Sequence, residues 1–304
     1  MGIKLFKEPK LENPVMIAGW PGIGNIGLVA VDHLRTMVSA EEFGEIEPWE
    51  FFYPRKVFIR NGELLGLEFP INKFYFKQTG NRDLIFFIGE EQPAEGGSAY
   101  AEGAKAYRMA NMVLDVATQF GCRRVYTSGA AVAPIHHTMK SRVWAVPNSE
   151  DLVSEVKSYQ NTVLMSDIEG RGGQGHITGL NGLLLGVAKR RGLEAVCVMG
   201  EIPVYLHGFP FVYPKASKSV LEVLCSVLGL EPELQSIDEF AQQQEREIEN
   251  LYQKLPEEIK GQLEKLKHVT YTRQAEPGII TEEDKKKILE DIDKMFKKQP
   301  PKEG

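Results

Sequence analysis

The stretch Val15–Gly27 reads Val-Met-Ile-Ala-Gly-Trp-Pro-Gly-Ile-Gly-Asn-Ile-Gly, a short apolar run that passes into closely spaced glycines. Residues 28–38 then place apolar side chains at helical spacing, so the sequence predicts a buried strand, a glycine loop and a helix in that order. Three of the glycines have the G-x-G-x-x-G spacing, which lets backbone N–H groups at a helix N-terminus approach a phosphate. We therefore take the residues of this loop as candidate ligand-binding positions: Gly22, Gly24, Asn25 and Gly27.

A dinucleotide site needs more than this glycine spacing. It also needs a second strand that ends in Asp or Glu about 20 residues further on. The residues at that distance, 41–50, include Gly44 and Pro48, and no clear strand precedes their acidic side chains. We therefore expect a tight strand-to-helix crossover rather than a nicotinamide site, and we expect no cofactor.

The composition excludes several classes of partner. The chain has 304 residues, of which 42% are hydrophobic, and this is enough for a sizeable core. A net charge of −6 provides no field that attracts nucleic acid or an anionic membrane. No run approaches the roughly 18 apolar residues of a membrane span, and the first residues lack the apolar core of a signal peptide. Three widely spaced cysteines suit a reducing compartment. The sequence therefore predicts a cytoplasmic protein that binds neither nucleic acid nor membrane.

Strand-like and helix-like segments alternate from residue 14 to residue 229. This alternation predicts a three-layer α/β/α domain with a mostly parallel mixed sheet. We expect an antiparallel hairpin as an insertion, because Asn61-Gly62 separates two segments rich in aromatic and branched residues and favours a type I′ turn. Beyond the α/β domain the composition becomes charged and helical. We predict an α/β domain at 1–230, a helical C-terminal extension at 231–298 and a disordered tail at 299–304.

A second glycine-rich stretch, residues 170–179, precedes another apolar helix and partly repeats the first loop. Glycines beside Arg and His at a helix start are candidates for an anion-binding nest. The alternative is that these glycines only permit tight packing of a helix on a sheet, since the stretch does not match the G-x-x-x-x-G-K-[ST] phosphate loop. The candidate ligand-binding residues of this stretch are Arg171, Gly173, Gly175 and His176.

Two further segments are candidates to line a site. Glu90 and Glu91 stand at the carboxyl end of the apolar run 83–89, where ligands bind in open α/β sheets. We take Glu90 as a ligand-binding candidate, with a solvated pair of loop acids as the alternative. Aromatic residues alternate through the loop 205–213, and this pattern favours either a pocket lining or a packed or subunit-facing loop.

The sequence contains few signs of a catalytic site. The sequence contains no G-x-S-x-G nucleophile elbow, no H-E-x-x-H helix and no Cys–His pairing identifiable by spacing. Ser128 lacks the glycine two positions before it that a hydrolase nucleophile of that type requires. His136 and His137 lack a carboxylate at i+3 or i+4, so we interpret them as polar loop histidines rather than metal ligands. We therefore assign no catalytic and no metal-binding residue.

Several motifs, taken together, resemble one family. Over roughly residues 12–230 they occur in the order found in the proteasome assembly chaperone 2 family: Gly19-Trp-Pro-Gly-Ile-Gly-Asn-Ile-Gly27, Ser128-Gly-Ala-Ala, Pro134-Ile-His-His-Thr138 with Val146-Pro-Asn148, Gly173-Gln-Gly-His-Ile-Thr-Gly-Leu180, and Glu201-Ile-Pro-Val-Tyr205 with Pro214-Lys-Ala-Ser217. The resemblance implies a nucleoside-phosphorylase-like α/β domain that is commonly homo-oligomeric. It also implies kinship with eukaryotic and archaeal chaperones of proteasome assembly.

The sequence departs from this family at one point. Chaperones of this type that dock on proteasome α-subunit rings can end in a hydrophobic-Tyr-X tail, whereas this sequence ends Gln299-Pro-Pro-Lys-Glu-Gly304. The segment Val269-Thr-Tyr271 has a similar character but is internal. Docking through a free C-terminal tail is therefore not expected, and proteasome assembly enters only by analogy with the family.

Two functions follow as hypotheses. The first is a non-enzymatic, homo-oligomeric chaperone or assembly factor with a protein client that is proteasome-related by family analogy. The alternative is a small-molecule protein that binds a nucleoside, a nucleotide or another anion, or a cryptic phosphorylase-like or hydrolase-like enzyme.

Overall fold

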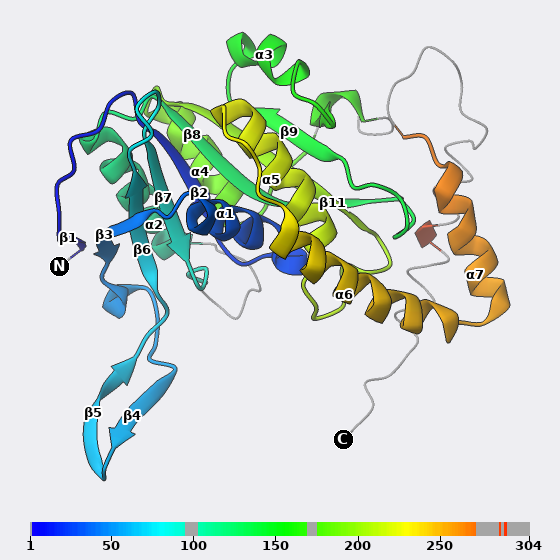
Figure 1. Ribbon diagram of the computed structural model, residues 1–304, viewed down its shortest axis with the longest axis horizontal. Coiled ribbons are helices and arrows are strands. Elements are labelled where there is room, and N and C mark those ends of the chain that lie inside the picture. Colours follow the sequence, from blue (N-terminus) through cyan, green and yellow to red (C-terminus); the bar gives the residue numbers. More distant parts are fainter. Residues whose placement is uncertain (1, 95–102, 169–174, 272–285, 287–288, 291–304) are drawn as a thin grey trace.

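The computed structural model describes residues 2–94, 103–168, 175–271, 286 and 289–290. Its centre is a nine-stranded mixed sheet with helices on both faces (Figure 1). The strands of this sheet are β1 (Ile3–Leu5), β2 (Val15–Gly19), β3 (Glu41–Ile46), β6 (Asn72–Lys77), β7 (Leu84–Gly89), β8 (Arg124–Ala133), β9 (Val143–Pro147), β10 (Thr162–Leu164) and β11 (Glu194–Pro203). The helices are α1 (Ile26–Met37), α2 (Gly103–Gln119), α3 (Val153–Lys157), α4 (Gly179–Arg190), α5 (Pro214–Leu228), α6 (Gln235–Gln253) and α7 (Glu257–Glu264). The prediction of an α/β domain followed by helices is confirmed.

The sheet combines parallel and antiparallel pairs of strands. Its strand order is β1-β3-β6-β7-β2-β8-β11-β9-β10, and the neighbours from β7 to β11 are parallel. On one side β6, β3 and β1 follow antiparallel; on the other side β9 is antiparallel to β11, and β10 is parallel to β9. The predicted mixed sheet is therefore confirmed, but among the described strands it is parallel in only four of its eight neighbouring pairs.

Strand β2 divides the core into two layers. Val15 and Ile17 pack with α1 and α5 on one face, while Met16 and Ala18 pack with α2 and α4 on the other. Alternate side chains of a strand point to opposite faces, so a strand covered on both sides reads as one continuous apolar run. All five residues of β2 are buried. The opening stretch of the sequence therefore lies at the centre of the fold.

Strand β3 occupies a segment in which the sequence showed no clear strand. It lies near the edge of the sheet, with Phe43 and Ile46 buried, and its pairing with β6 is irregular between Glu42 and Gly44. Because β3 is antiparallel to its neighbours and does not touch β2, it is not the parallel second strand that a dinucleotide site requires. The expectation of a crossover rather than a nicotinamide site agrees with this arrangement.

The hairpin predicted at Asn61-Gly62 is present but stands outside the main sheet. Asn61 and Gly62 have φ values of 52° and 79°, as the left-handed residues of a type I′ turn require. They join β4 (Lys56–Arg60) and β5 (Glu63–Glu68), which form a separate two-stranded sheet. Figure 1 shows this hairpin projecting away from the body, and we call residues 56–68 the arm.

The C-terminal helices pack on the α/β core. α5 ends at Gly229, whose φ of 70° suits a left-handed helix end. Buried residues of α6 and α7, including Ile248, Tyr252 and Leu263, join the same apolar cluster as α1 and α5. The domain boundary at residue 230 stays a prediction. Apart from residues 286, 289 and 290, the expected last helix and the tail 299–304 lie outside the described residues.

Within the described part of the chain, no helix combines the length and the apolar character that a bilayer crossing requires.

Candidate functional site

The first glycine loop forms a tight crossover from β2 to α1. Gly24 has a φ of 59°, and its carbonyl oxygen accepts a hydrogen bond from the N–H of Tyr213 at 2.8 Å. A Cβ atom at Gly27 would lie 2.2 Å from the carbonyl oxygen of Ser128. The first turn of α1 therefore rests directly on the backbone of β8, and Gly27 is required by packing. Packing against β8 is sufficient to explain why residue 27 is a glycine.

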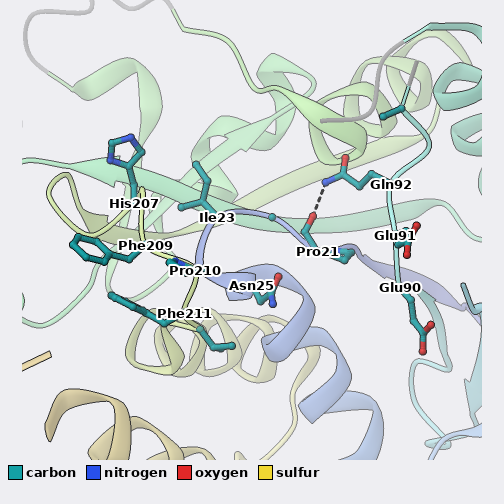
Figure 2. A pocket seen from close by; sticks show the side chains of 14 residues that line it. Pro21, Ile23, Asn25, Glu90, Glu91, Gln92, His207, Phe209, Pro210 and Phe211 are labelled. Carbon is teal, nitrogen blue, oxygen red and sulfur yellow. Dashed lines mark hydrogen bonds between the residues drawn. The ribbon is translucent and has the colours of Figure 1, made fainter. Parts of the chain in front are cut away.

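Gln92 links the two crossovers. Its Nε2 donates a hydrogen bond to the carbonyl oxygen of Pro21 in the first loop at 2.5 Å (Figure 2). Its Oε1 accepts one from the N–H of Leu180, in the first turn of α4, at 2.9 Å. The sequence pattern indicated the neighbouring acids, Glu90 and Glu91, but not Gln92. The available signal was its place just beyond the carboxyl end of β7, where side chains reach both loops.

A small cavity of about 110 Å³ separates the two crossovers, and we call it the inter-loop cavity. It is lined by Trp20, Gly22, Ile23, Gly27, Gln92, Gly129, Ala130, His176, Ile177, Thr178, Asn181 and Met199. Asn181 is only 7% exposed, and its Oδ1 has no hydrogen-bond partner among the described residues. An unpaired buried polar atom is costly, so a polar group placed in this cavity would gain a hydrogen bond.

A larger cavity of about 560 Å³ lies on the other side of the first loop, and we call it the aromatic groove (Figure 2). Figure 2 shows the glycine loop between His207, Phe209 and Phe211 on one side and Glu90 and Glu91 on the other. The rings of Phe209 and Phe211 stack with their centroids 5.7 Å apart. The aromatic loop 205–213 therefore both lines a pocket and packs into the fold. His207, Phe209 and Phe211 line the groove, while Tyr205 and Tyr213 are buried.

The two acids of this groove are engaged in ion pairs. Arg55, at the base of the arm, lies 2.9 Å from Glu90 and 2.6 Å from Glu91. Glu90 also accepts a hydrogen bond from the N–H of Ile71 at 3.1 Å. These contacts fasten the base of the arm to the end of β7. Glu90 therefore has a structural role that the sequence did not indicate.

The structure brings together most of the residues predicted from the two glycine loops. Gly22, Gly24, Asn25 and Glu90 line the aromatic groove, while Gly22, Gly27 and His176 line the inter-loop cavity. Gly175 lines neither cavity, and a Cβ atom there would meet Met165. Arg171 and Gly173 lie outside the described residues. Ligand binding by this set stays a prediction.

A buried carboxylate stands at the carboxyl end of β11. Glu201 is fully buried, and its oxygens accept hydrogen bonds from the N–H of Arg142 at 3.0 Å and from the Nε1 of Trp144 at 2.6 Å. The guanidinium of Arg142 lies 3.3 Å from the same carboxylate. Tyr271 donates its hydroxyl to Glu201 and packs its ring against the Arg142 guanidinium. Burial, reinforced by Glu201, raises the pKa of Tyr271. The internal segment Val269-Thr-Tyr271 is therefore held inside the fold by its tyrosine.

The adjacent histidines are buried beneath the C-terminal helices. His136 and His137 lie with their rings 4.2 Å apart, and the ring of Tyr252 from α6 packs against both. The N–H of His137 donates to the hydroxyl of Tyr205 at 2.7 Å, and its Nε2 lies 3.3 Å from a carboxylate oxygen of Glu249. Burial, with the neighbouring His137, lowers the pKa of His136 to about 4. Both histidines thus form the contact between the core and α6, and the interpretation as polar loop residues missed this burial.

No cluster of three or more His, Cys, Asp or Glu side chains placed to hold a metal ion occurs in the part of the chain that the structure describes.

Comparison with known proteins gives concordant matches. The sequence model of the PAC2 family matches residues 16–252. An uncharacterized protein of Methanocaldococcus jannaschii is 29% identical over 253 residues, which cover 83% of this chain and 87% of that protein.

Solved structures match over most of their length. The crystal structure of Pyrococcus furiosus PbaB, described as an archaeal proteasome activator, is similar with a TM-score of 0.68 and 31% identity, and the match covers 82% of this chain and 97% of PbaB. Pyrococcus furiosus PbaA, described as an archaeal homolog of proteasome-assembly chaperone, is similar with a TM-score of 0.60 and 23% identity over 82% of this chain and 96% of PbaA. At that identity PbaA bears on the fold alone.

Proposed function

Because the chain belongs to the PAC2 family, we propose that it is a non-enzymatic, homo-oligomeric assembly factor whose protein partner is related to the proteasome. The observation that carries this proposal is the match with PbaB, which extends over 97% of that protein at 31% identity. A match of this extent covers most of the chain rather than one motif. The nucleoside-phosphorylase-like character of the fold belongs to the same proposal.

The ion pairs made by the acids near the glycine loops support a structural rather than a catalytic role for these side chains. Glu90 and Glu91 hold Arg55 at the base of the arm, and Glu201 holds Arg142 in the core. A general acid or base needs a side chain that is placed to exchange a proton with a substrate. These three carboxylates are instead occupied by contacts within the fold. Three free, buried cysteines support the further proposal of a reducing, cytoplasmic location.

Affinity capture from the native host tests the proposed partner. We expect the tagged chain to retain proteasome subunits or their assembly precursors, identified by quantitative mass spectrometry against an unrelated protein with the same tag. The capture is repeated with the C-terminal tail 299–304 removed, and we expect the same partners, since the proposal does not use a free tail. Retention of no protein above background contradicts the proposal.

A second candidate function rests on the inter-loop cavity. This cavity lies between the two glycine loops, and Asn181 at the start of α4 lines it with an Oδ1 that no described residue pairs. The Oδ1 of Asn181 is a hydrogen-bond acceptor, so it suits an N–H or O–H group at the polar edge of a nucleoside. The nearby N-terminus of α4 favours negative charge, such as that of a phosphate group. We therefore propose small-molecule binding in this cavity as the alternative to a purely structural role for the loops.

Thermal unfolding in the presence of phosphate, nucleosides and nucleotides tests this alternative. A ligand that binds only the folded state at about 100 times its Kd stabilises it by about 2.7 kcal/mol, which corresponds to several degrees in Tm. We expect Asn181→Ala to unfold at a similar temperature without ligand and to lose the shift. If no compound raises the Tm of the wild-type protein, small-molecule binding at this cavity is excluded for these classes.

A further inference from the structure

The arm has no partner within the described fold. β4 and β5 pair only with each other among the described strands, and Figure 1 shows them extending away from the sheet and its helices. Its attachment is at its base, where Arg55 binds the two acids at the end of β7. An isolated two-stranded hairpin is at best marginally stable in water. The arm is therefore an element that needs a further surface to pack against.

One face of the arm is entirely aliphatic. The register places Val57 opposite Leu67 and Ile59 opposite Leu64, on either side of an irregularity between Phe58 and Ile59, and residues directly opposite each other share a face. These four side chains are 55%, 51%, 66% and 63% exposed, in that order. Contiguous exposed aliphatic groups on a hairpin with two open edges mark a site of association.

The two strands of the arm carry charges of opposite sign. The only charged residues of β4 are basic and lie at its two ends, Lys56 and Arg60, while those of β5 are acidic and lie at its two ends, Glu63 and Glu68. Within one arm Lys56 is opposite Glu68, with their charged atoms 3.5 Å apart, and Arg60 is opposite Glu63. The outer edge of β4 therefore has basic residues at its two ends, and the outer edge of β5 has acidic residues at its two ends.

Only one of the possible edge pairings between two arms matches these charges. Antiparallel pairing of two β4 edges would put Lys56 opposite Arg60, and pairing of two β5 edges would put Glu63 opposite Glu68. Like charges directly opposite each other destabilise a sheet. Pairing of β4 in one copy with β5 in the next repeats the contacts already made inside each arm. This contact uses different surfaces on the two copies, so it is heterologous. A heterologous contact gives a closed ring when the rotation between copies closes and an open filament when it does not, and the ring is the arrangement that leaves no arm edge unpaired.

We propose that the arm is the self-association surface of this chain, in which β4 of one copy pairs with β5 of the next. The occupant of each open edge is a second copy of the same chain. In the closed ring the aliphatic faces point inward and cover one another, as in a small barrel. This inference rests on the homo-oligomer of the proposed function and names the contact that forms it.

Charge exchange on the full-length chain tests the pairing. One variant combines Lys56→Glu with Arg60→Glu and has only acidic arms, while another combines Glu63→Lys with Glu68→Lys and has only basic arms. We expect each variant alone to be monomeric by light scattering, with the circular dichroism spectrum of the wild-type body. A tagged acidic-arm variant is expected to capture the untagged basic-arm variant and not an untagged copy of itself. The fourfold exchange restores the complementarity and is expected to recover the wild-type mass.

A second pair of substitutions removes the aliphatic face without changing charge. Ile59→Thr with Leu64→Thr keeps residues that favour strands and is expected to weaken self-association by at least about tenfold. Wild-type mass in the acidic-arm and basic-arm variants overturns the assignment of the arm while leaving the homo-oligomer intact. A monomeric wild-type protein overturns the homo-oligomer itself. Neither result bears on the captured proteasome partner, so the three failures are distinguishable.

Discussion

Gly27→Ala is expected to prevent the α/β core from folding. The added Cβ would lie 2.2 Å from the carbonyl oxygen and 2.5 Å from the carbonyl carbon of Ser128. Both atoms belong to the backbone of the central strand β8, so neither can turn aside as a side chain would. Relief requires α1 to move away from the sheet, which opens the apolar cluster around Ile26 and Ala30. Overpacking of a core costs about 1 to 3 kcal/mol or more, and here the contact is with backbone. We expect insoluble protein, or a loss of the cooperative unfolding transition by circular dichroism.

Gly22→Ala is the matched control for this substitution. It adds the same methyl group five residues earlier in the same loop, where no heavy atom of the described residues lies within 4 Å of the new Cβ. The φ of Gly22 is −168°, an extended conformation that alanine adopts without strain. We expect wild-type folding and solubility. If Gly27→Ala folded as well as Gly22→Ala, the packing explanation of Gly27 would be wrong.

Glu201→Gln is expected to cost about 3 to 5 kcal/mol of unfolding free energy, measured by urea denaturation. Glutamine keeps the size of the side chain and an oxygen that accepts from Trp144, but it removes the negative charge beside Arg142. The guanidinium then stays partly buried without its counter-charge. Loss of one partner of a buried pair is far more costly than loss of a surface pair.

The control for this charge removal is Glu41→Gln. Glu41 pairs with Lys7 at 3.0 Å, and both side chains are more than half exposed. Exposed pairs of this kind contribute about 0 to 1 kcal/mol, so we expect almost unchanged stability. Similar losses of unfolding free energy in the two variants would mean that burial does not determine how much Glu201 contributes to stability.

Local sequence signals predicted the elements that depend on local chemistry. The apolar run before Gly19 predicted β2, because a strand covered on both faces needs apolar side chains at every position. Asn61-Gly62 predicted the type I′ turn, because both residues tolerate positive φ. Strand β3 was missed, since its place next to the edge strand leaves Glu41 exposed and Glu42 and Glu45 half-buried, and these acids interrupt the apolar pattern.

The contacts that shape the candidate site were not predictable in this way. Gln92 meets Pro21 and Leu180, which lie 71 and 88 residues away in the sequence. His136 and His137 are covered by α6, more than 100 residues further along. Such burial depends on how distant segments dock, and spacing within a motif contains no information about it. The sequence therefore identified the two glycine loops, whereas the fold determined which side chains surround them.

The contact between Tyr271 and Glu201 also sets an order of events during synthesis. The two residues are 70 positions apart, and the tyrosine is the later one. At translation rates of about 5 to 20 residues per second, Tyr271 is added roughly 4 to 14 seconds after Glu201. During that interval the Glu201 carboxylate lacks the tyrosine hydroxyl from which it accepts a hydrogen bond in the finished fold. The contact therefore forms only after α6 and α7, which precede Tyr271 in the chain, have been synthesised.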